Sequence, residues 1–214
     1  MTSRQRGAAM VEFQIVAMSA VLPLLFGILQ IGQLLIGHHV LSFAASEAAR
    51  AGAVDHARAA AMMQGLIDGL LPLFVATDRV DAGGAPPTSA VLAARARAEA
   101  DVRLHARIER LTPSNADFAD HARVAHGQRY IPNDALEYRD TAPRRAGGKS
   151  LQAANLLRIR VTWCQPLVVP LIDRLLPALL ERLDPDPADL VCYAARRVPL
   201  RVQTTAPMQS AAWP

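Results

Sequence analysis

The sequence predicts an α+β protein in which a long N-terminal transmembrane helix precedes further helices and a small antiparallel sheet. Three observations lead to this prediction. A charge-free apolar segment lies near the N-terminus, apolar residues recur at helical spacing in the middle of the chain, and apolar and polar residues alternate near the C-terminus. Helices that bury one face show a period of about 3.6 residues, and half-buried strands show a period of two.

The N-terminal apolar segment is long enough to cross a membrane. Residues Phe13–Ser46 contain no Asp, Glu, Lys or Arg, and the densest apolar part is Ile15–Ile36. A helix rises ~1.5 Å per residue, so about 20 apolar residues cross a hydrocarbon core of ~30 Å. Pro23 is tolerated because proline kinks membrane helices rather than ending them. The polar side chains of this part can bond to backbone or to a neighbouring helix: Ser19, Gln30 and Gln33.

One helix is expected over about residues 8–61, because an alanine-rich stretch with almost no helix breaker follows the span. A retained anchor is favoured over a cleaved signal peptide, whose apolar part usually has ~7–15 residues. Arg4 and Arg6 precede the span. Glu47 and Arg50 follow it and nearly cancel each other. Because basic flanks stay in the cytoplasm, the N-terminus is expected inside and the chain after about residue 38 outside.

A short basic leader, a glycine and a single carboxylate come just before the span. With its apolar run and the alanine-rich FAASEAARAGAV that follows, RGAAMVEFQIVAMSAVLPLLFGILQIGQLL resembles the TadE-like proteins, which are pseudopilins of the tight-adherence (Flp, type IVb) pilus machinery. The resemblance implies that a prepilin peptidase cuts after Gly7, so that Ala8 becomes the N-terminus. Glu12 is then the fifth residue and the aromatic Phe13 follows it, as in the family.

In pilins generally, that glutamate is thought to neutralise the N-terminal ammonium of a neighbouring subunit. The physics is coherent, because two charges in a low-dielectric setting are tolerable when they pair. From the residues alone, the simpler interpretation is a Glu12 carboxylate that is solvated at the cytoplasmic interface, near the positive end of the helix dipole.

The middle of the chain is expected to be helical at first and then irregular. In His56–Phe74, apolar residues recur at helical spacing up to a proline that ends or bends the helix. Ala82–Pro87 predicts a turn or linker. Ser89–Leu111 predicts a surface helix with local ion pairs between its arginines and acidic residues. Residues 112–150 are expected to form loops, with a short strand near Arg129–Ile131.

Near the C-terminus the pattern changes to that of strands. Asn155–Cys164 alternates apolar and polar residues, as in a strand with one wet face. Leu190–Ala194 and Leu200–Thr204 are the matching short strands. Between the strand Asn155–Cys164 and these later strands, the stretch Pro166–Leu183 is strongly apolar but holds three prolines. It therefore predicts a helix that packs on the sheet or lies on the membrane surface, rather than a second span.

The two cysteines are a candidate disulfide. Cys164 and Cys192 lie on two of the predicted strands, 28 positions apart. If this region is outside the cytoplasm, an oxidising compartment favours a disulfide over two separate buried thiols. Closing such a loop adds roughly 3 kcal/mol of stability.

Composition excludes several classes of protein. Of the 214 residues, 51% are hydrophobic and 20% are charged, which is unlike a disordered chain. Two cysteines are too few for a disulfide scaffold or a Cys-rich zinc module. The net charge is +4, and Lys149 is the only lysine among 23 basic residues. The arginines are scattered and aromatic residues are scarce, so no nucleic-acid partner is expected.

The sequence contains no standard catalytic motif. His121 and His126 share a polar stretch with Asp117 and Asp120, but their spacing matches no standard metal site. The sequence has no Gly-rich phosphate loop, no Gly-x-Ser-x-Gly and no His-Glu-x-x-His. We therefore expect no enzymatic activity, no metal and no cofactor.

The expected organisation has four parts: a leader (1–7), a transmembrane and pilin-like helix (8–54), a helical and loop region (55–150) and a C-terminal strand–helix–strand region (151–214). The resemblance implies a minor pseudopilin of a pilus or related secretion system, in the bacterial inner membrane with its domain in the periplasm. It also implies the partners: the prepilin peptidase, other Tad pseudopilins and platform proteins, the major Flp pilin and the lipid bilayer. Two alternatives stay open. One is a membrane-anchored periplasmic binding or enzymatic domain unrelated to pili, and the other is a secreted protein with a long signal sequence.

Overall fold

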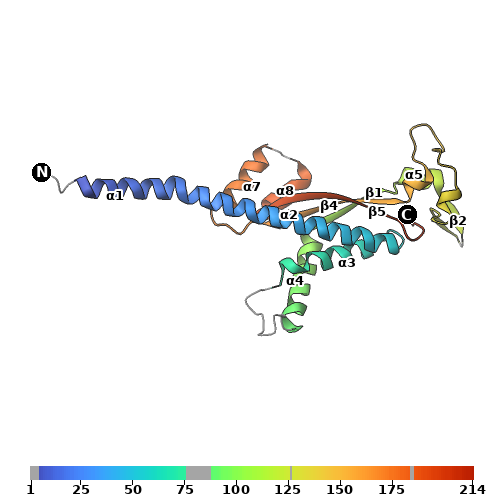
Figure 1. Cartoon of the computed structure of the whole chain (residues 1–214), viewed down its shortest axis with the longest axis horizontal. Helices are drawn as coiled ribbons and strands as arrows, with labels where there is room; N and C mark the ends of the chain where they lie inside the picture. The colour runs from blue at the N-terminus through green and yellow to red at the C-terminus, as the bar shows by residue number, and fades with distance from the viewer. Residues whose placement is uncertain (1–4, 76–87, 126, 184–185) are drawn as a thin grey trace. The chain divides into compact units, whose positions relative to one another are not determined.

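The structure is a computed structural model that describes residues 5–75, 88–125, 127–183 and 186–214. The chain forms two compact units: Met1–Gly37 with Cys164–Pro199, and His38–Trp163 with Leu200–Pro214. Figure 1 labels most of the helices and strands along the chain. The α+β prediction is confirmed, since a long apolar helix precedes further helices and two small sheets. The expected linker at Ala82–Pro87 and the residue His126 lie outside the described residues.

The N-terminal helix continues through its proline. It consists of α1 (Gln5–Val16), a π-helical turn η1 (Ala17–Val21) and α2 (Leu22–Val54). Pro23 has no N–H to donate to the carbonyl four residues before it, and its ring crowds that carbonyl. In η1 the N–H of Leu22 donates to the carbonyl of Ala17 instead, which widens the helix locally and accommodates the proline.

This long helix ends at Val54, so the expected continuation to residue 61 is wrong. His56 and its successor have φ values of 57° and 59°, which turn the chain into α3 (Ala59–Leu70). The His56 ring stacks on Trp213, with ring centroids 4.2 Å apart. A contact with a residue so distant in sequence stabilises the turn, although no Gly or Pro marks it locally.

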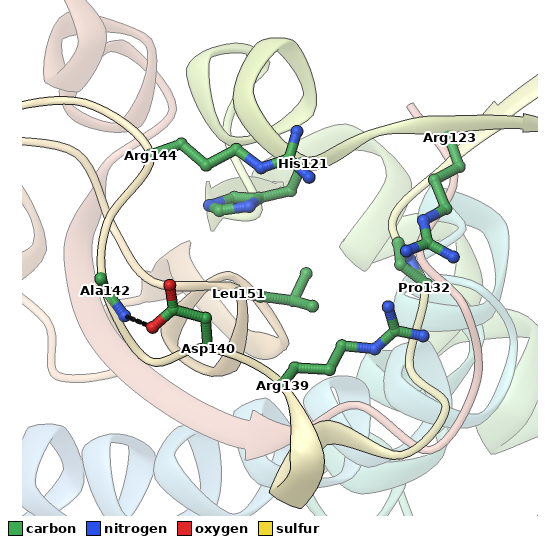
Figure 2. A pocket seen from close by; sticks show the side chains of 8 residues that line it. All are labelled: His121, Arg123, Pro132, Arg139, Asp140, Ala142, Arg144 and Leu151. Carbon is green, nitrogen blue, oxygen red and sulfur yellow. Dashed lines mark hydrogen bonds between the residues drawn. The ribbon is translucent and has the colours of Figure 1, made fainter.

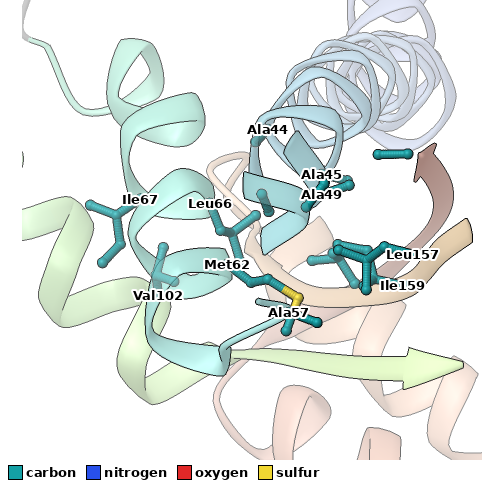
Figure 3. Close-up of a cluster of buried hydrophobic side chains, with 14 of the residues drawn as sticks. Ala44, Ala45, Ala49, Ala57, Met62, Leu66, Ile67, Val102, Leu157 and Ile159 are labelled. Atoms are coloured by element: carbon teal, nitrogen blue, oxygen red, sulfur yellow. The ribbon is translucent and has the colours of Figure 1, made fainter. Parts of the chain in front are cut away.

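Small residues bring α2 and α3 close together in the core of the second unit. Gly65 lies against Ala48, and Gly69 lies against Ala44, so the two helices run antiparallel. Figure 3 shows side chains of α2, α3, α4 and β4 meeting in this core. The helical pattern predicted for His56–Phe74 is confirmed, with a 3₁₀ turn η2 (Leu71–Leu73) at its proline. The buried side chains of this part include Leu41, Ala44, Ala48, Met62, Leu66 and Leu70.

The helix expected at Ser89–Leu111 is a helix only in its first part. It consists of α4 (Thr88–His105), followed by strand β1 (Ala106–Thr112). β1 pairs antiparallel with β4 (Leu156–Pro166), and Ile108 lies opposite Val161. The edge of β4 provides partners for the β1 backbone, and this non-local pairing overrides the local helical pattern.

The sheet of β1, β4 and β5 has the order β1–β4–β5. The strand predicted at Asn155–Cys164 is confirmed as β4, in which Leu157 and Ile159 are fully buried while Arg158 between them is exposed. The strand predicted at Leu200–Thr204 lies within the longer β5 (Arg197–Pro207).

Residues 112–150 contain more regular structure than expected. The short strand predicted near Arg129–Ile131 is β3 (Gln128–Tyr130), which pairs antiparallel with β2 (Arg123–Ala125). Helix α5 (Asn115–His121) was not predicted. It begins at Ser114 in a capping box with Asp117, a signal that the sequence does contain. A 3₁₀ turn η4 (Leu136–Tyr138) and α6 (Leu151–Ala154) follow.

In the first unit, two helices lie between β4 and β5 along the chain: α7 (Ile172–Leu183) and α8 (Pro187–Ala194). The prediction of a strand at Leu190–Ala194 is therefore wrong. The Asp186 side chain accepts a hydrogen bond from the N–H of Ala188 at 2.9 Å, and a proline occupies the first helical position. Both features favour the start of a helix.

Candidate functional site

The N-terminal helix presents an exposed apolar surface. Residues Met10–Val54 form a helix that is long and apolar enough to cross a membrane, and only 6% of its most apolar part is buried. Large side chains along it are open to the surroundings, for example Phe13 at 72% and Leu24 at 65% exposure. A core helix of a soluble protein would bury most of this surface.

The residues named for processing and packing all lie in α1. Gly7 and Ala8 are in its first turn. Glu12 is exposed, as is Phe13, and Glu12 forms no ion pair with any of the residues that the structure describes. An unpaired carboxylate on an apolar helix is costly in a membrane and is free to meet a cation from another molecule. Cleavage after Gly7 and the pairing of Glu12 remain predictions.

Polar contacts attach the end of β4 to α2 in the first unit. Gln30 is 1% exposed, and its Oε1 accepts the N–H of Val169 at 3.1 Å. Nε2 of Gln165 donates to the carbonyl of Gln33 at 2.8 Å. Gly37 lies directly against the Gln165 amide, so that a side chain there would displace this amide. The glutamines of the apolar segment thus mark the level at which the chain after β4 meets the helix.

The disulfide expected between Cys164 and Cys192 is present. Both residues are buried, at 6% and 2% exposure. Cys192 lies on α8 rather than on a strand, so the bond links the end of β4 to a helix. It closes a loop that includes α7.

A cavity of about 380 Å³ lies in the second unit beside α5 and the loop after η4 (Figure 2). His121, Asp140 and three arginines (Arg123, Arg139 and Arg144) contribute to its lining. Figure 2 shows Arg123 and Arg139 reaching toward each other along one side of the hollow. The excess of guanidinium groups favours an anion over a cation. The described residues of the lining include no Ser, Thr, Cys or Lys that a base could activate as a nucleophile.

The polar stretch that suggested metal ligands has structural partners. The His121 Nε2 is 2.8 Å from the carbonyl of Lys149, and Asp117 forms an ion pair with Lys149 at 2.9 Å. Among the described residues there is no group of three or more His, Cys, Asp or Glu that could hold a metal ion.

The Asp117 carboxylate is the hydrogen-bonding centre of this stretch. Burial alone would raise its pKa. Hydrogen bonds from the Ser114 N–H at 2.7 Å, from Lys149 Nζ at 2.9 Å and from the Ser114 hydroxyl at 2.8 Å favour the charged form, as does the Lys149 charge. Together they hold the pKa of Asp117 below its ordinary value. The carboxylate therefore stabilises α5 and the Lys149 segment when it is ionised.

We expect Asp117→Asn to lower the free energy of unfolding by about 1–3 kcal/mol at pH 7, since it removes charge-assisted hydrogen bonds. A lowered pKa in the folded state gives stability that is present above the unfolded pKa and is lost as pH falls through the folded pKa. The difference in the free energy of unfolding between the variant and the original chain should therefore shrink in acid. Thermal unfolding of both full chains in detergent, repeated at several pH values, measures this difference. The matched control is Glu137→Gln, an exposed carboxylate; a loss for Asp117→Asn that does not change with pH would contradict the assignment.

These features define a class: a chain with one exposed, membrane-length N-terminal helix, continued by a small α+β part that contains a disulfide. The family model described as TadE-like protein matches residues 7–50, which confirms the resemblance inferred from the sequence. The matched residues run from Gly7 through the apolar span to Arg50. The match indicates a component related to the Tad pilus. No curated protein and no solved structure matches the chain.

Proposed function

We propose that the protein is a minor pseudopilin that serves in the assembly of a tight-adherence pilus or a related secretion apparatus. It is anchored in the bacterial inner membrane by the helix of residues 8–54, with its N-terminus in the cytoplasm and the rest of the chain in the periplasm. The observation that carries the proposal is the TadE-like match at residues 7–50, which coincides with the exposed apolar helix. The protein acts by helix packing and is the substrate, not the agent, of covalent processing.

The proposal gives Glu12 a specific partner. Cleavage after Gly7 frees the amino group of Ala8, and the Glu12 carboxylate of a neighbouring subunit pairs with that ammonium. Each charge alone is costly at the membrane edge, and pairing offsets part of that cost. The exposed position of Glu12 on α1 leaves the carboxylate accessible for such a contact.

The helix also has open positions where another helix can approach closely. A Cβ added at Gly27 or Gly32 would meet no atom of the described structure within 4 Å. Small residues on a membrane helix allow the backbones of two helices to come near each other. Gly32, unlike Gly37, is free for packing between subunits, whereas Gly27 lines a groove beside α7.

The proposal is tested by intact mass and N-terminal sequencing of the membrane-purified protein, expressed with and without a cognate prepilin peptidase. We expect peptidase-dependent loss of residues 1–7 and a new N-terminus at Ala8. Gly7→Leu should block the cut, whereas the control Gly27→Leu, the same change elsewhere in the helix, should not. Glu12→Ala keeps the glycine, so it should still be cut, but it should recover less of the neighbouring pilin subunits after cross-linking.

The other outcomes identify the alternatives. A leader that stays intact with and without the peptidase contradicts the pseudopilin proposal and favours a plain membrane-anchored domain. A cut beyond about residue 45 would instead indicate a secreted protein with a long signal sequence.

A further inference from the structure

We propose that α7 is an interfacial membrane helix, whose leucine face enters the lipid of the periplasmic leaflet beside α2, and that the hydrocarbon core ends at the level of Gln30. This inference rests on the proposed membrane anchor and adds a second site at which the chain meets lipid. The occupant of the exposed face of α7 is thus the bilayer.

A row of leucines on α7 is left unburied. Leu175, Leu179 and Leu183 of α7 recur every four residues and are 57%, 54% and 71% exposed; Leu171, just before the helix, is 50% exposed. Residues four apart lie on the same side of a helix. Full burial of one leucine contributes about 1.5–3 kcal/mol, so a helical row of exposed leucines is unfavourable in water and favourable in lipid.

The row adjoins the surface of the membrane helix. Leu175 and Leu179 of α7 and Ile31 and Leu34 of α2 line one groove of about 290 Å³. Among the described residues of its lining, Gln30 has the only polar side chain, and its Oε1 accepts the N–H of Val169. The groove is therefore continuous with the apolar surface of α2, and lipid that surrounds α2 also reaches the leucines of α7.

The length of the apolar helix indicates where this groove lies relative to the membrane. Met10–Leu29 contains 20 residues, which at ~1.5 Å each match a hydrocarbon core of ~30 Å. The next residue is Gln30, where the polar contacts with the chain after β4 begin. The groove extends from Gly27 to Leu34 on α2 and so straddles this boundary. Amphipathic helices that lie on membranes bury their apolar face by about 5–10 Å at the same boundary.

The other side of α7 is held by protein and carries charge. Asp173 forms an ion pair with Arg196 at 3.8 Å. Arg174 and Arg182 are exposed, and Arg182 follows Leu179 by three residues, beside the leucine row. Arginines at the edge of an apolar face suit lipid phosphates, toward which their long side chains can extend. This arrangement favours lipid over a second apolar helix as the occupant.

Three tryptophan variants of the full chain test the inference: Leu179→Trp on the leucine row, Arg174→Trp as the matched control on the polar side of α7, and Leu24→Trp within the span. Each is reconstituted in vesicles of phosphatidylethanolamine and phosphatidylglycerol that contain phosphatidylcholine brominated either near the headgroup or near the acyl-chain end. Quenching by bromine is compared after subtraction of the signal of the unmodified chain, which comes from Trp163 and Trp213.

We expect the Leu179→Trp signal to be quenched severalfold more than that of Arg174→Trp, most strongly by bromine near the headgroup. Leu24→Trp should be quenched more by the deeper bromine. If Leu24→Trp is quenched but Leu179→Trp is no more quenched than Arg174→Trp, α7 does not enter the membrane. The inference about α7 then fails, while the proposed membrane anchor stands. If Leu179→Trp is shielded from both bromolipid and aqueous acrylamide, a protein covers the leucines, which also overturns it. If Leu24→Trp is not quenched, the membrane anchor itself is wrong.

Discussion

Gly69→Leu is expected to lower the free energy of unfolding by about 3 kcal/mol or more, near or above the upper end of the usual cost of overpacking a core. Any Cβ at position 69 overlaps the Cα and Cβ of Ala44 on α2, and at position 65 it would lie 2.9 Å from the Ala48 Cα. Backbone atoms of a packed helix cannot rotate away as a flexible side chain can. The two helices must therefore separate, which disrupts the core that both share with β4.

Even alanine at position 69 should destabilise the protein. In an exposed helix, replacing glycine with alanine is favourable by about 1 kcal/mol. At Gly69 the clash with α2 opposes this gain. A net loss of stability would show that the clash outweighs the gain in helix propensity. The matched control is Ala60→Leu, on the exposed side of α3, which should change stability by less than about 0.5 kcal/mol. Denaturant unfolding of the full chain in detergent, followed by tryptophan fluorescence, measures these changes. Equal stability of Gly69→Leu and the original chain would contradict the close packing.

The sequence was enough to predict an element where that element's own residues carry a regular pattern. The apolar segment at Ile15–Ile36 needs no partner to be recognised, because length and absence of charge define it. β4 was predicted because its buried and exposed faces alternate with side-chain type, and α3 because its apolar positions follow the helical period.

Prediction from local sequence failed where residues distant in the sequence determine the structure. The helix ends at Val54 because the chain turns at His56, which is stacked on Trp213 near the other end of the sequence. β1 is a strand because β4 lies beside it, although the preceding α4 residues continue a helical pattern. The helix α8 was missed for another reason: Asp186 and the proline after it are local start signals, but the apolar residues that follow resemble a short strand.

The residues of the candidate site also divide into those that the sequence could predict and those that it could not. Gly7, Ala8, Glu12 and Phe13 come from a resemblance that lies within contiguous sequence, and the family match covers those positions. The groove of α7 could not be predicted as such, because it exists only once Leu175 and Leu179 lie beside Ile31 of α2. The sequence indicated an apolar, proline-interrupted helix there, but left open whether it packs on the sheet or lies on a membrane.

Removal of the disulfide by Cys164→Ala and Cys192→Ala together is expected to lower stability by about 3–4 kcal/mol, the value for closing a loop of this length in the unfolded chain. The loop spans 28 positions and contains α7 and most of α8. Loss of the bond should therefore increase amide hydrogen exchange most in α8. Reductant should destabilise the original chain to the same extent and leave the double variant unchanged. If reductant has no effect on the original chain, the disulfide does not contribute to the stability of the folded protein.

The same bond reports on which side of the membrane the C-terminal part lies. Disulfides persist in the periplasm and are reduced in the cytoplasm. Protein taken from cells in the presence of a thiol-blocking reagent should therefore have both cysteines protected, and its intact mass should be lower by two hydrogens than that of the reduced chain. Fusing an extra basic segment after residue 38 provides the control, since positive charge there opposes export and should leave the thiols free to react. Free thiols at Cys164 and Cys192 in the original chain would contradict the periplasmic placement, whatever happens at Gly7, because processing of the leader and export of the domain are separate events.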